Sequence, residues 1–134
     1  MIIRLTIALP EAWHLPLAGA AEMVGCVMFR ALRERGVALF AAEPAVAERI
    51  GLLYDEILGD EIGHVGHIAA RLGPPGRLVM RTLYRFLARR VASGLPELRA
   101  LFGRRELARR FGAPFRLDQM VAELPGRAYA TALI

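Results

Sequence analysis

The sequence predicts an all-α protein, on three observations. Hydrophobic residues make up 55% of the 134 residues and aromatic residues only 7%, a composition typical of helices packed through small and aliphatic side chains. Prolines and glycines divide the chain into long segments that start at proline and end at glycine, as helices do. Apolar residues in the longest segment recur with the helical period. We expect one helical domain over residues 1–134, long enough to bury its own core.

The first predicted helix begins at Pro16 and ends near Arg35. Proline suits the first turn because its missing N–H has no partner there. Arg30 and Arg33 lie toward the other end, where the helix dipole favours cations, and Gly36 follows as a stop.

Residues 12–29 are apolar enough to be considered as a membrane span. Glu22 lies in their middle and argues against it, because a carboxylate at the centre of a bilayer is costly. Residues 1–9 are also apolar, but Pro10 interrupts them before they reach the length of a signal peptide. The single cysteine, Cys26, excludes an internal disulfide and fits a reducing compartment. We therefore expect a cytoplasmic protein.

The second predicted helix, residues 44–72, is the longest. It begins at a proline, and a Gly-Pro-Pro run ends it. Its length is roughly 43 Å at about 1.5 Å per residue, which suits a bundle more than a compact globule. Gly59, Gly63 and Gly66 lie along its back, and each costs about 1 kcal/mol relative to alanine. We expect another backbone to pack closely against them.

Prolines at helix starts and glycines after helix ends also predict three shorter helices, over residues 75–93, 96–110 and 118–124. Gly94 and Gly112 follow the first two as stops, and Asp118 is the expected cap of the third. The tail, residues 127–134, receives no assignment. The chain thus divides into a helical hairpin, residues 16–72, and a C-terminal helical region, residues 75–134.

The two parts differ in charge. All 18 basic residues are arginine; residues 1–71 hold six of them against nine acidic residues, net −3, and residues 72–134 hold twelve against four, net +8. In the C-terminal region, four arginines recur every four residues: Arg77, Arg81, Arg85 and Arg89. Like charges at this spacing line one helical face and destabilise it unless anions lie opposite. Asp55, Glu56 and Asp60, from this chain or a second copy, are the expected anions.

Glu61 and His64 form a pattern typical of metal sites. They are three residues apart, so both side chains lie on one side of the long helix. Projection at about 100° per residue places Glu61 near the middle of an apolar stripe. The stripe comprises Ile50, Tyr54, Ile57, Glu61, His64, Val65, Ile68 and Leu72. A buried carboxylate without a partner costs several kcal/mol, so we expect a cation beside Glu61.

Glu22 supports the same prediction from another helix. It is the only formally charged side chain in residues 12–29. Gly25 and Cys26, one turn further on, are small enough to leave room for an ion or for a neighbouring helix.

A single Glu followed some forty residues later by Glu-x-x-His resembles half of a ferritin-like di-iron carboxylate site, which uses this unit twice inside a four-helix bundle. The resemblance covers residues 16–72. It implies a half-bundle in which Glu22 is a single-carboxylate ligand, Glu61 bridges two metal ions and His64 is a terminal ligand. Asp60 would then act as a hydrogen-bond partner of an imidazole outside the ligand shell.

The chain contains no second unit of this kind. Either two copies pair about a two-fold axis, or the chain is part of a longer protein whose N-terminal half carries the other ligands. The donors suit two iron ions, with manganese and zinc as alternatives. The resemblance then implies an enzyme that uses oxygen to oxidise or hydroxylate a small molecule, or that oxidises iron itself.

Tyr54, His67 and Cys26 lie near the predicted ligands. Tyr54 is either a hydrogen-bond donor or oxidisable neighbour of the site, or an ordinary core residue. His67, at the edge of the stripe, is either an outer partner of the site or a surface histidine. Cys26 has no histidine at a useful spacing, and its apolar segment should raise its thiol pKa, so we predict no nucleophile.

Other interpretations remain open. If the long helix is turned, Glu61 and His64 face solvent or pair with arginines of the third helix, and Glu22 could form a buried ion pair with an internal arginine. The competing function is a non-enzymatic module whose basic face docks an acidic protein, a nucleic acid or an anionic membrane surface. The sequence lacks a glycine-rich phosphate loop, zinc-finger spacing and a nucleophile elbow, so nucleotide hydrolysis and acyl transfer are not supported.

Overall fold

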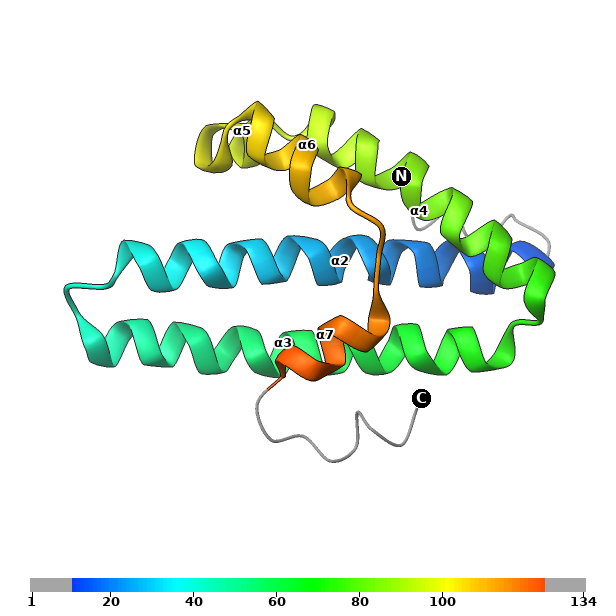
Figure 1. Cartoon of the computed structure of the whole chain (residues 1–134), viewed down its shortest axis with the longest axis horizontal. Helices are drawn as coiled ribbons and strands as arrows, with labels where there is room; N and C mark the ends of the chain where they lie inside the picture. The colour runs from blue at the N-terminus through cyan, green and yellow to red at the C-terminus, as the bar shows by residue number, and fades with distance from the viewer. Residues whose placement is uncertain (1–10, 125–134) are drawn as a thin grey trace.

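The computed structural model describes residues 11–124, which are helical throughout apart from short connections and contain no strand (Figure 1). The helices are α2 (Glu11–Leu39), α3 (Pro44–Arg71), α4 (Pro74–Gly94), α5 (Pro96–Phe102), α6 (Arg104–Gly112) and α7 (Leu117–Glu123). The prediction of an all-α protein is confirmed for these residues. Residues 127–134, for which no helix or strand was predicted, lie outside the described residues.

Helices α2 and α3 form a long antiparallel hairpin (Figure 1). Helix α3 has nearly the predicted ends, but α2 is longer than predicted: it begins at Glu11, includes Pro16 and continues past Gly36. Gly36 does not stop the helix. A Cβ atom there would lie 2.9 Å from Cγ2 of Ile50, so this glycine instead allows α3 to approach α2 closely.

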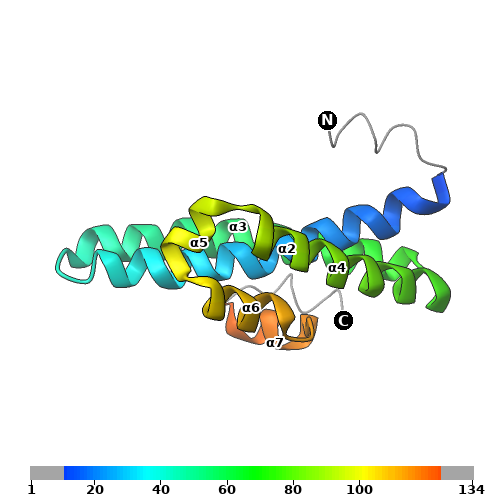
Figure 2. The same cartoon turned by 90° about the horizontal axis from the view of Figure 1, so that it is seen from above.

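The shorter helices cover part of the hairpin. Helix α4 leaves the end of α3 and crosses α2, α6 packs on α4, and α7 packs on α3 (Figures 1 and 2). The single helix predicted over residues 96–110 is wrong, because Gly103 breaks it with a φ of 78°, a left-handed value that favours glycine. Asp118 does not cap α7 with its side chain; it forms an ion pair with Arg116 at 3.0 Å.

Helix α2 packs against α3, α4 and α6 and so lies at the centre of the described fold. The hydrophobic core is one cluster of buried residues from all six helices: Ala20, Met23, Val24 and Cys26 of α2, Ile62, Val65 and Ile68 of α3, Met80, Tyr84 and Ala88 of α4, Leu98 of α5, Leu107 and Phe111 of α6, and Met120 of α7. By length and a mean hydropathy of 1.4, residues Trp13–Leu39 would also be apolar enough to cross a membrane, and 39% of this candidate span is buried within the fold.

Helix α3 is rotated relative to the predicted stripe. Its buried residues are Gly51, Asp55, Leu58, Gly59, Ile62, Val65, Gly66 and Ile68. Glu61 therefore lies half-buried at the edge of the buried face, and not near its middle as predicted. The apolar pattern missed this face because three of its members are glycines, which have no side chain to mark it. Gly63 was wrongly expected to contact a backbone, since an added Cβ there meets no atom within 4 Å.

Candidate metal centre

Glu22 of α2 meets Glu61 and His64 of α3 where the two helices pack together. One ligand atom from each of the three side chains lies within 4.8 Å of the others. Nδ1 of His64 is 3.9 Å from Oε1 of Glu22. The structure thus brings together, from two helices, the three residues that the sequence singles out as metal ligands.

Gly25 creates the space for this approach. An added Cβ at Gly25 would lie 3.1 Å from Oε2 of Glu61, closer than ordinary van der Waals contact. The carboxylate of Glu61 therefore extends across α2 over a position that has no side chain. This agrees with the prediction that the small residues after Glu22 leave room for an ion or a close helix.

Neither carboxylate is paired with an arginine of the described residues. Arg33 of α2 pairs instead with Asp55, with Nε and Nη2 donating to the two carboxylate oxygens at 2.8 and 3.0 Å. The alternatives in which Glu22 or Glu61 is neutralised by an arginine are therefore wrong for residues 11–124. The basic side chain beside the two carboxylates is that of His64, which is 62% exposed.

The pKa of Glu61 is raised to about 8, and partial burial is the largest cause. A hydrogen bond with Glu22 and repulsion from Glu22 and Asp60 contribute to the rise. Without a cation, Glu61 therefore holds a proton at neutral pH, next to a second carboxylate. A divalent cation would displace this proton and neutralise both groups, so the donor set fits a metal ion.

Cys26 is fully buried, and the structure confirms the predicted rise of its thiol pKa. Burial raises the pKa first, and the carboxylates of Glu61 and Glu22 add to the effect. The thiol is therefore neutral and inert, and it forms part of the apolar surroundings of the site.

The predicted outer residues lie around the cluster without joining it. Tyr54 packs its ring against Phe29, with centroids 6.4 Å apart, and its hydroxyl forms no hydrogen bond with a described ligand residue. Asp60 is exposed and acts on Glu61 through charge alone. His67 is exposed, with Nε2 3.4 Å from Nη1 of Arg71.

The four arginines that recur every four residues in α4, which are Arg77, Arg81, Arg85 and Arg89, do not contact the acidic residues expected opposite them. Asp55 is paired with Arg33, and no ion pair joins the four arginines to any described residue. Arg77 donates instead to the backbone carbonyl of Leu72 at 2.9 Å. The prediction of a charge match within the chain is therefore wrong for residues 11–124, where α4 packs mainly on α2 and α6; a match with the acidic residues of a second copy stays a prediction.

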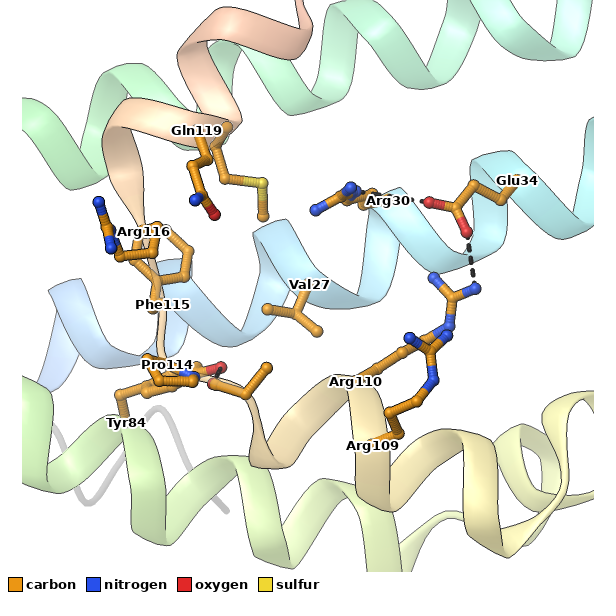
Figure 3. A pocket seen from close by; sticks show the side chains of 12 residues that line it. Val27, Arg30, Glu34, Tyr84, Arg109, Arg110, Pro114, Phe115, Arg116 and Gln119 are labelled. Carbon is orange, nitrogen blue, oxygen red and sulfur yellow. Dashed lines mark hydrogen bonds and ion pairs between the residues drawn. The ribbon is translucent and has the colours of Figure 1, made fainter.

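A cavity that sequence reasoning missed lies between α2, α6 and the segment before α7 (Figure 3). Its volume is about 370 Å³, and acidic residues neutralise its arginines. Arg110 contacts Glu34 and Glu106 at 2.6 Å each, and Arg30 contacts Glu123 at 2.9 Å. Glu34 and Arg110, and likewise Arg30 and Glu123, are far apart in the chain, so no local sequence pattern predicts these two pairs; only Glu106 and Arg110 are neighbours on one helix.

No family model matches the chain, and no curated protein and no solved structure matches it. Its function is therefore inferred from the geometry of its own residues.

Proposed function

We propose that the protein binds iron, or alternatively manganese, through Glu22, Glu61 and His64, and that it catalyses oxygen-dependent oxidation or hydroxylation of a small molecule. The observation that carries the proposal is the convergence of two carboxylates and an imidazole within 4.8 Å, with no arginine of the described residues beside them. Oxygen donors with one imidazole suit these metals. Bound iron would supply the electrons for oxygen chemistry.

The chain's own residues have distinct tasks in this proposal. Glu22 and Glu61 supply negative charge from two helices, and Gly25 lets the Glu61 carboxylate reach across α2. His64 supplies a neutral nitrogen donor from the exposed side. Partial burial of the two carboxylates strengthens their attraction for a cation, because solvent screens buried charges less.

Three donors are too few for two metal ions, so we propose that a second copy of the chain completes the site. Glu22 and Glu61 are only partly buried, and the side chain of His64 is 62% exposed. Leu53, which lies on the same side of α3 as His64 at helical spacing, is 55% exposed. A two-fold axis here would place two sets of donors face to face, as two halves of a ferritin-like four-helix bundle.

The test combines solution mass, metal stoichiometry and absorption after anaerobic addition of ferrous iron followed by air. We expect one metal ion per chain in a dimer and a ferric absorption band that requires all three donors. H64Q should lose metal, whereas the matched control H67Q, an exposed histidine on the same helix, should retain it. A folded monomer that binds no metal would overturn the proposal.

A further inference from the structure

A second cavity, of about 500 Å³, lies between α4 and the segment that joins α6 to α7. Arg81, Arg85 and Arg89 line it from α4, and Arg116 lines it from the joining segment. We call it the basic cavity. No aspartate or glutamate is among its lining residues.

The arginines that α4 contributes to the basic cavity are not neutralised within the described chain. Arg81, Arg85 and Arg89 are exposed and form no ion pair with residues 11–124. The neighbouring cavity of Figure 3 provides an internal comparison, because its arginines Arg30 and Arg110 both contact glutamates. Like charges at four-residue spacing on a helix repel one another, so an external anion bound in the basic cavity would stabilise the protein.

The positive surface continues beyond this cavity. A hollow of about 600 Å³ shares Arg89 and Phe111 with it and adds Arg99 and Arg104, again without an acidic residue in its lining. A single inorganic ion would leave most of these guanidinium groups without a partner. Guanidinium groups bind phosphate through paired N–H donors, so the arrangement fits a ligand with at least two phosphates.

The wall of the basic cavity is apolar and fixed. Phe115 packs edge-on against Tyr84 with centroids 5.7 Å apart, and Phe111 is only 4% exposed. The Tyr84 hydroxyl donates to the backbone carbonyl of Ala113 at 3.5 Å and ties the joining segment to α4. Phe115 is partly exposed and offers a flat surface beside the arginines.

We propose that the basic cavity binds a small phosphorylated ligand of the size and charge of a nucleoside diphosphate, with its phosphates on Arg81, Arg85 and Arg89 and its planar group against Phe115. Small-molecule sites have volumes of about 300–1,000 Å³ and combine apolar walls with few charged groups. A nucleic acid would need the charges on an open surface; here they line a hollow.

The test is calorimetric titration of the full chain, freed of metal by chelation, with ADP, pyrophosphate and adenosine. We expect ADP to bind more tightly than pyrophosphate and adenosine not to bind. R85Q and R89Q should each weaken ADP binding about tenfold, the ratio that corresponds to about 1.4 kcal/mol for a lost charge-assisted hydrogen bond. F115A should weaken binding of ADP but not of pyrophosphate.

The matched control is R49Q, which removes an exposed arginine of α3 that does not line the basic cavity; circular dichroism tests whether each variant is folded. The proposal is overturned if folded wild-type protein binds neither ADP nor pyrophosphate, or if R49Q weakens binding as much as R85Q. It is also overturned if a single-stranded oligonucleotide binds and ADP does not, since that result assigns the arginines to a nucleic-acid surface. Because the protein is metal-free, failure here leaves the metal proposal untouched.

Discussion

Substitution of Gly25 by alanine should change stability and metal binding in opposite directions. Glycine within a helix costs about 1 kcal/mol relative to alanine, so G25A should stabilise the metal-free protein by up to about that amount. The new Cβ would lie 3.1 Å from Oε2 of Glu61, which must move by a few tenths of an ångström. Glu61 can rotate away, since its side chain ends near the surface of the hairpin.

That shift moves the Glu61 carboxylate out of the position in which it meets Glu22 and His64, so metal affinity should fall. Loss of a group that positions a metal ligand typically costs 10- to 100-fold in affinity, and we expect a decrease of about tenfold. The measurements are urea unfolding of the metal-free protein and titration with ferrous iron under anaerobic conditions. G63A is the matched control, because an added Cβ there meets no atom within 4 Å. If G25A bound metal as tightly as G63A, the role assigned to Gly25 would be wrong.

Three further predictions concern stability. The pKa of Glu61 is raised from 4.5 to about 8 in the folded, metal-free protein. The folded state therefore binds more protons than the unfolded state, and stability should fall as pH rises from 4.5 to about 8. In E61Q the urea midpoint should decline less over this pH range than in the wild type, and an equal decline would refute the assignment. R33A leaves the buried carboxylate of Asp55 unpaired and should lower the free energy of unfolding by about 3 kcal/mol. R35A, which removes an exposed arginine of the same helix, should lower it only slightly. G103A forces a side chain into the left-handed φ of 78° and should cost about 1 kcal/mol in thermal or urea unfolding, with G112A as a control that should show no comparable loss.

Proline and glycine each predicted some helix ends correctly and others wrongly. Pro44 and Pro96 each begin a helix, because proline loses nothing in the first turn, whereas Pro16 lies inside α2. Gly36 and Gly103 look alike in the sequence, yet Gly36 lies inside α2 against Ile50, and Gly103 is a break. The difference depends on what packs beside each glycine, which no local pattern contains.

The proximity of the three candidate ligands was predictable for a different reason. A lone carboxylate in an apolar helix and a Glu-x-x-His on the next helix are local signals, and a hairpin brings neighbouring helices together. The burial of Glu61 was predicted wrongly because glycines hide the buried face of α3. The pairing of Arg33 with Asp55, 22 residues apart, needed the register of the two helices, and the sequence alone does not supply it.

The full burial of Cys26 makes this lone sulfur a natural reporter of motion. An alkylating reagent can reach it only when α2 separates from its neighbours, and the reagent then reacts with the small fraction of thiolate that forms. The rate of alkylation therefore measures how often the hairpin opens, without any label added to the protein. A metal ion bound to both Glu22 and Glu61 would hold α2 and α3 together and would therefore slow this reaction.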